Sequence, residues 1–270
     1  MLNKILKISI VIVVLSNLIY AEDKIPAGWW QKGSYQYEET NATLAHIEGM
    51  ISYSKTSGND DNEDLKIKVA GKIRSGHVGA SLSYTKIDQK HKSYNDKNDK
   101  TPAATSKDDY TTTLILGYDI NKDFFLNLGY ENSRNLTFEI YNQTTKYLGV
   151  GYRLLSTDMH RLNVFLAVGT EDISFGTYPQ LPSGETDCMY YQANYTWFMQ
   201  PRVLFSTNYT YLQAKKDNRD TATLTAKVKV KVTKNISLIV GYSNEFMEAQ
   251  DTVNRYTHDE TVFTAVKFDF

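Results

Sequence analysis

The sequence has little of what holds most small secreted domains together. Cysteine occurs once, at position 188, so no disulfide can form within the chain. Proline occurs only 5 times in 270 residues. Nothing after residue 21 approaches the run of about 20 apolar residues that a transmembrane helix needs. These absences exclude an internal disulfide framework and a helical membrane protein beyond that point.

An excess of charge of one sign is also lacking. The formal net charge is −1, from 30 basic and 31 acidic residues. Removing residues 1–21 takes away Lys4 and Lys7 and leaves 28 against 31, or −3. This balance gives no electrostatic argument for a nucleic-acid partner, and we expect none.

The first residues have the order of a secretory signal peptide. Lys4 and Lys7 give a positive start, residues 8–15 form a short apolar core, and Ala21 is a small residue at the cleavage position. An uncleaved anchor helix is the alternative, but polar residues interrupt the apolar run. We therefore predict three parts: a signal peptide over 1–21, a periplasmic extension over 22–41 and a folded unit over 42–270.

Apolar and polar residues alternate along most of the remaining chain. Leu65, Ile67 and Val69 alternate with Lys66 and Lys68, for example. A period of two is typical of a β-strand with one apolar and one polar face. The pattern predicts strands at about 42–56, 65–75, 77–88, 109–120, 124–132, 138–155, 162–175, 188–199, 202–213, 220–233, 236–246 and 260–270.

The connections between these segments are of two kinds. The first, third and later odd-numbered connections are mostly long and polar, whereas the even-numbered ones are tight, such as Gly76 and Gln200-Pro201. A soluble β-sandwich also fits the composition, but it gives no reason to sort the loops in this way. The sorting favours an all-β fold, a transmembrane antiparallel barrel of about 12 strands in the bacterial outer membrane. Short turns would then face the periplasm and longer loops the outside.

Aromatic residues favour the same interpretation. Amphipathic rings prefer the interface between lipid and water, and here they gather at both ends of the apolar face. Near the long loops these residues are Tyr84, Tyr130, Tyr209, Tyr211 and Tyr242, and near the short turns they are Tyr118, Phe124, Tyr152, Trp197, Phe268 and Phe270.

The last strand ends on Phe268 and Phe270. An amphipathic final strand that closes on a terminal Phe resembles the sorting signal of outer-membrane barrels. The resemblance implies the barrel assembly machinery as a partner during biogenesis. We expect outer-membrane lipid and lipopolysaccharide around the folded protein.

Two stretches carry a resemblance to a known family. They are His46-Ile47-Glu48-Gly49 running through Tyr53 to Ser57-Gly58-Asn59, and Tyr147-Leu148-Gly149-Val150-Gly151-Tyr152-Arg153. The chain resembles the YdiY-like salt-induced outer-membrane proteins over nearly its whole mature length. The resemblance implies an outer-membrane barrel and brings neither an established activity nor catalytic residues.

The five histidines are the first candidates for catalytic residues. His46 faces the predicted lumen, His77 and His160 fall at short turns, and His91 and His258 fall in loops. None is paired with a serine in a recognisable motif, and neither an H-E-x-x-H sequence nor a cysteine cluster occurs. We predict no catalytic residue, no cofactor and no enzymatic activity.

Four acidic residues crowd the first predicted loop: Asp60, Asp61, Glu63 and Asp64. Carboxylates so close together are weak candidates for a Ca²⁺ site, but their spacing is not that of an EF-hand. A solvated acidic tip is the favoured interpretation. Such a tip could share divalent cations with lipopolysaccharide phosphates.

The predicted lumen face carries more basic than acidic residues. The basic residues are Lys66, Lys68, Lys72, Arg74, Arg153, Lys227, Lys229, Lys231 and Lys267, and the acidic ones are Glu48, Asp119, Glu131, Glu171, Glu245 and Asp269. One hypothesis is a narrow channel with a slight anion preference, or a protein linked to salt or envelope stress. The alternative is a structural barrel whose lumen is filled by ion pairs and whose loops bind lipopolysaccharide, cations or a partner. A lipid-modifying enzyme is the third and least favoured hypothesis.

Overall fold

A computed structural model describes residues 43–58, 62–93, 103–136, 140–175, 183–215, 219–249 and 255–270. The expected signal peptide (1–21) and the extension (22–41) lie outside these ranges. The strands are β1 (Thr43–Gly58), β2 (Asn62–Ser75), β3 (Val78–Ser93), β4 (Ala103–Asp119), β5 (Phe124–Asn135), β6 (Ile140–Ser156), β7 (His160–Phe175), β8 (Gly184–Gln200), β9 (Val203–Ala214), β10 (Arg219–Lys231), β11 (Ile236–Ala249) and β12 (Arg255–Asp269).

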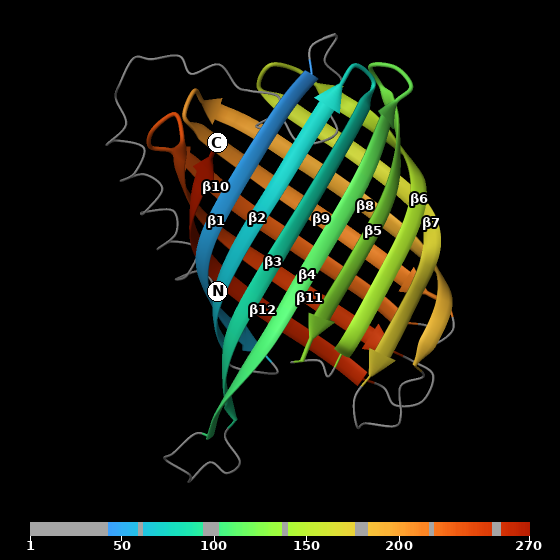
Figure 1. Cartoon of the computed structure of the whole chain (residues 1–270), viewed down its shortest axis with the longest axis vertical. Coiled ribbons are helices and arrows are strands. Elements are labelled where there is room, and N and C mark those ends of the chain that lie inside the picture. Colours follow the sequence, from blue (N-terminus) through green and yellow to red (C-terminus); the bar gives the residue numbers. More distant parts are fainter. Residues whose placement is uncertain are drawn as a thin grey trace.

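The twelve strands form one closed barrel (Figure 1). Each strand pairs antiparallel with its neighbours in the sequence, and β1 pairs with β12 to close the ring. Closure leaves no edge strand, so every strand can satisfy its backbone hydrogen bonds within the sheet. No helix in the described ranges is both long and apolar enough to cross a membrane.

The alternation of apolar and polar residues along each strand gives the barrel wall two unlike faces. On β2, Ile67 and Val69 point outward and are 46% and 54% exposed, whereas Lys66 and Lys68 point inward. Val168 on β7 is likewise outward and 62% exposed. Exposed aliphatic side chains on the outside and polar ones inside are the reverse of a soluble protein and match a barrel surrounded by lipid.

The two ends of the barrel differ as the sequence predicts. The short turns all lie at one end, at the top of Figure 1. In one of them Gly76 has φ of 54°, a left-handed conformation that glycine adopts without strain. In another, the side chain of Asn121 accepts hydrogen bonds from the backbone N–H groups of Asp123 and Phe124, both at 2.8 Å.

The predicted strand ends were wrong towards the long loops. The strands have 12 to 17 residues, more than the 9 to 11 expected from the bilayer thickness. The β3–β4 hairpin extends beyond the other strands at the bottom of Figure 1. His91 and His258, expected in loops, lie in β3 and β12. Alternation of apolar side chains stops where the membrane stops, but backbone pairing continues beyond it.

Candidate pore lining

The candidate site is the inner face of the barrel. The register places all the charged residues of the predicted lining on this face. Lys227, for example, lies opposite Ser206 and Gly241, and Lys68 lies opposite Met50. These charges differ in how far neighbouring groups neutralise them.

Three of the lysines, Lys68, Lys227 and Lys229, form a group that we call the lysine cluster. No ion pair joins them to a carboxylate in the described part of the chain. The charge of Lys227 is repelled most strongly by Lys68 and Lys267. Lys227 is nevertheless exposed although it points inward. An inward ammonium group that stays exposed has space beside it that water can enter.

Next to the lysine cluster, an ion-pair network lies near the short turns. Lys267 Nζ lies 2.6 Å from Glu48 and 2.9 Å from Asp269, and Lys72 Nζ lies 3.9 Å from Glu48. His46 Nε2 is 3.1 Å from Asp269. These contacts join β1, β2 and β12 where the barrel closes. They also engage Glu48 and Asp269, neither of which forms an ion pair with the lysine cluster.

Part of this network has the geometry of a metal site. Among the described residues, His46, Glu48 and Asp269 offer ligand atoms that all lie within 4.8 Å of one another. The ammonium group of Lys267, however, bonds both carboxylates. A divalent cation would have to displace it. We therefore interpret the group as an ion-pair network.

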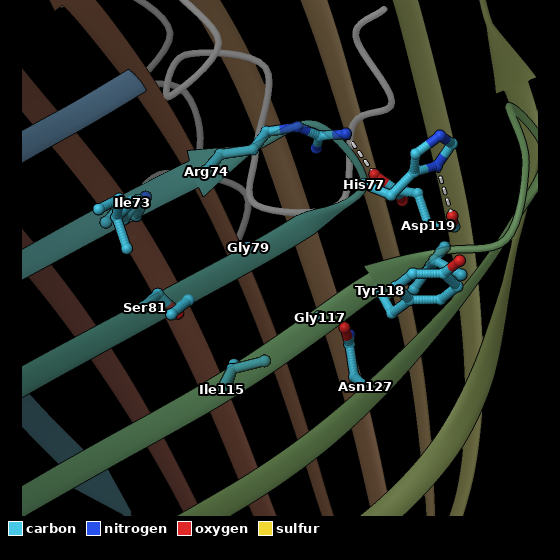
Figure 2. Close-up of a pocket in the computed structure, with 13 residues that line it drawn as sticks. Ile73, Arg74, His77, Gly79, Ser81, Ile115, Gly117, Tyr118, Asp119 and Asn127 are labelled. Carbon is cyan, nitrogen blue, oxygen red and sulfur yellow. Dashed lines mark hydrogen bonds and ion pairs between the residues drawn. The ribbon is translucent and has the colours of Figure 1, made fainter. Parts of the chain in front are cut away.

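A second network of ion pairs and hydrogen bonds lies in the lumen wall beside the β4–β5 turn. Arg74 and Arg153 both bond the carboxylate of Asp119, and Figure 2 shows Arg74 reaching it. Arg153 also donates to two carbonyls of the 120–123 turn, each at 3.1 Å. His77 Nδ1 lies 2.8 Å from the carbonyl oxygen of Asp119. Both arginines are buried, and their contacts brace the turn rather than face the water of the lumen.

Opposite the lysine cluster, an aromatic group covers the inner face of β5 to β8. Tyr147 stacks on Tyr190 with ring centroids 4.9 Å apart, and Phe125 stacks on Phe165 at 6.2 Å. The guanidinium carbon of Arg153 lies 4.9 Å from the centre of the Phe125 ring. We call Phe125, Tyr147, Phe165 and Tyr190 the aromatic side of the lumen.

Glycines on neighbouring strands hold these rings against the wall. A Cβ atom at Gly129 would overlap the ring of Tyr147, and one at Gly151 would overlap the ring of Phe125. An aromatic side chain packed over a cross-strand glycine replaces the missing side-chain contact. The motif Tyr147–Arg153, which carried the family resemblance, thus contains both a ring and a glycine of this packing.

Sequence reasoning missed a buried ion pair towards the long loops. Arg219 bonds Glu171, and the two residues are 1% and 0% exposed. Gln143 also donates to Glu171. Arg219 had been placed in a loop, although it lies two residues before Thr221 and continues the inward alternation of β10. Two buried inward acids, Asp64 and Asp259, were missed for the same reason, and a third, Asp109, was placed in a strand but not assigned to the lining.

The acidic loop was predicted incorrectly in part. Glu63 and Asp64 lie in β2, not in a loop, because pairing with β1 continues to Thr56 and Asn62. Asp64 is buried, accepts a hydrogen bond from Ser54 at 3.2 Å and lies 3.7 Å from Lys66. Asp60 and Asp61 lie outside the described residues.

The two terminal phenylalanines lie on the outer face at the closure. Phe268 pairs with Gly49 on β1 and Ile236 on β11. Phe270 exchanges two backbone hydrogen bonds with Ile47, of 2.9 and 3.4 Å, and is 75% exposed. The terminal residue therefore completes the pairing of the last strand with the first.

A closed antiparallel barrel of twelve strands with an aliphatic outer face and a charged inner face has the fold of the transmembrane β-barrels of the outer membrane. The solved structures that share this fold include two outer-membrane proteins. The NanC porin has 9% identity and a TM-score of 0.54 over 82% of this chain and 98% of its own. An outer-membrane channel from Pseudomonas putida F1 has 12% identity and a TM-score of 0.51 over 88% and 98%.

The family follows from the sequence itself. Residues 49–270 match the family described as "Protein of unknown function, DUF481", and the chain belongs to it. A search of curated proteins found no match.

Proposed function

We propose that this protein is a narrow pore of the bacterial outer membrane with a modest preference for anions. The observation that carries the proposal is the exposure of Lys227, which points inward and has no ion-pair partner in the described part of the chain. A charge in this state needs water, and water beside it gives ions a path.

The preference for anions follows from the lysine cluster. Lys68, Lys227 and Lys229 carry positive charge that the adjacent ion-pair network leaves largely uncompensated. Rings of unpaired basic side chains raise the local concentration of anions and favour their passage. The aromatic side fills part of the cross-section, so the path is narrow. A barrel of twelve strands lies between small filled barrels and the 16–18-stranded porins with wide channels.

The experiment is a recording of purified, refolded protein in planar bilayers across a KCl gradient. The wild type should conduct, with a reversal potential of the sign that indicates anion flow. Replacing the lysine cluster with three glutamates should reverse that sign, and three glutamines should abolish the preference. Lys86→Glu is the charge-matched control, because Lys86 is exposed and pairs with Asp88 outside the lumen. Insertion without current, or a triple glutamate variant that keeps the wild-type potential, would overturn the proposal.

A filled structural barrel is the second candidate. The buried pairs at Arg219 and Asp119, together with the aromatic side, favour it because their buried side chains take up space inside the barrel. In that case the extracellular loops would carry the function, by binding lipopolysaccharide or divalent cations. Protein that inserts without conducting, but binds lipopolysaccharide, would support this candidate over the pore.

The resemblance to YdiY-like proteins adds a role in salt or envelope stress to the proposal. An increase in the protein after a shift to high salt, and a growth defect of the deletion strain there, would support it. No enzymatic step is part of the proposal. Lipid turnover by the purified protein, lost on substitution of His46, would contradict that part.

A further inference from the structure

A recess opens inside the barrel at the short-turn end, the end at the top of Figure 1, over β8, β9 and β10. The register places Phe198 opposite Leu204 and Leu204 opposite Lys229, so these three inward side chains lie in one row of the lining. The turns that follow β6 and β8 border the recess. Its volume is about 340 Å³, which lies within the range of roughly 300–1,000 Å³ that is typical of small-molecule sites.

Part of the lining is apolar. Met159 and Met199 add two thioether side chains to the surface that Phe198 and Leu204 provide. Methionine is flexible and polarisable, so it adapts to the shape of an apolar ligand. A simple ion would leave this surface in water, whereas a ligand with an apolar body would cover it and gain from the burial.

Three cationic side chains complete the lining: Lys229, Lys231 and Arg202. In the part of the chain that the structure describes, no ion pair joins any of them to a carboxylate. Lys231 is only 7% exposed, and Nε of Arg202 is buried without a hydrogen-bond partner among the described residues. Buried cations are costly without a counter-charge, so an anion is expected beside them.

The carboxylates near the recess do not cancel this charge. Asp158 is the acidic residue of the described lining, and it is exposed at its turn. Three positive charges against this one leave an excess of two. Asp269 attracts Lys231 from beyond the lining, but it bonds Lys267. The network around it sets two lysines against Glu48 and Asp269, and therefore does not reduce the excess.

We propose that this recess binds a small organic anion with an apolar body, of which an aromatic carboxylate is the simplest form. Lys231 and Arg202 hold the anionic head group, and Lys229 adds positive charge beside it. Phe198, Leu204 and the two methionines cover the apolar body. The site names the class of anion that the pore would serve, and to that extent it rests on the proposed function. Binding itself needs no current through the lumen.

The test uses benzoate as the probe and the protein refolded in detergent, with its methionine methyl groups labelled with ¹³C. Met159 and Met199 line the recess, whereas Met50 and Met247 do not. Benzoate should therefore shift the methyl signals of Met159 and Met199 in a saturable way and leave those of Met50 and Met247 in place. Acetate carries the charge without the apolar body, and benzyl alcohol carries the ring without the charge. Both should bind at least tenfold more weakly than benzoate.

Two variants remove the charge at the head group. Lys231→Gln and Arg202→Gln should each weaken benzoate binding about tenfold or more, because each loses a charge-assisted hydrogen bond. Lys234→Gln is the matched control: Lys234 lies three residues further along, is exposed in the β10–β11 turn and does not line the recess. It should bind benzoate like the wild type. Heat-modifiable migration on a gel shows that each variant has folded.

Several results would overturn the proposal. One is the absence of a saturable shift at Met159 and Met199, and another is wild-type affinity in both Lys231→Gln and Arg202→Gln. Benzyl alcohol that binds as tightly as benzoate would show that the cations do not select the ligand. Binding that appears only after removal of residues 22–41 would show that the chain itself occupies the recess. None of these results bears on the pore, which the reversal potential tests separately.

Discussion

The lumen wall has two unlike sides. On β10, β12 and β2 it carries lysines, of which Lys68, Lys227 and Lys229 lack an ion-pair partner among the described residues. On β5 to β8 it carries stacked aromatic rings packed over glycines. Both sides come from strands with the same alternating pattern. The difference shows that alternation determines which residues point inward, while the identity of those residues determines whether the space is filled or wet.

The two sides should differ in how much unfolding free energy is lost when an inward charge is removed. Arg219 is buried and bonded to Glu171, so Arg219→Met removes the positive charge beside a buried carboxylate. Breaking such a pair should cost about 3–5 kcal/mol of unfolding free energy. Lys227→Met removes an exposed charge without a partner and should cost far less. Urea unfolding followed by tryptophan fluorescence measures both, and equal losses would contradict the distinction.

The direction in which the side chains of the lysine-rich side point can be tested within β2. Val69 points to lipid, and the adjacent Lys68 points inward. An arginine at a lipid-facing position near mid-membrane costs about 2–4 kcal/mol, so Val69→Arg should reduce the folded, heat-modifiable fraction on a gel. Lys68→Gln should leave this fraction near the wild-type level. The opposite order would place the lysines outside, because a shift of one residue exchanges the two faces.

The packing of the aromatic side predicts a smaller effect. Gly151→Ala forces the ring of Phe125 away from the wall, and overpacking of this kind costs about 1–3 kcal/mol. Gly71→Ala is the matched control, with an expected change within about 0.5 kcal/mol. The double variant Gly151→Ala with Phe125→Leu should recover part of the loss. Additive losses would show that ring and glycine are not coupled.

The order and number of strands, the two faces and the sorting of loops could be predicted from the sequence, because each follows from local alternation and turn residues. The pairing of charges could not. Lys72 and Lys68 occupy equivalent positions in the pattern, yet only Lys72 lies within reach of Glu48. The register places Glu48 opposite Ala70, two residues from each lysine, so the difference lies in the side-chain conformations, which alternation does not specify.

The strand ends and the contacts between glycines and rings could not be predicted either, because neither is determined by the alternation of side chains. Arg219 lies beyond the apolar part of β10, where the alternation of side chains becomes polar on both faces. The contact of Gly151 with Phe125 needs the exact pairing of β5 and β6, where the two residues lie directly opposite. A one-residue shift would separate the ring from the glycine without changing the sequence pattern.

The most direct test of the two-sided lumen is the reactivity of single cysteines in the folded barrel. In a Cys188→Ser background, which removes the natural buried thiol, Lys227→Cys and Ala167→Cys place one thiol on each side. An anionic, membrane-impermeant thiol reagent should label Lys227→Cys quickly and Ala167→Cys very slowly, and its cationic analogue should label Lys227→Cys more slowly. Equal protection of both cysteines, or faster labelling at position 167, would contradict a lumen that is wet along its lysine side and filled along its aromatic side.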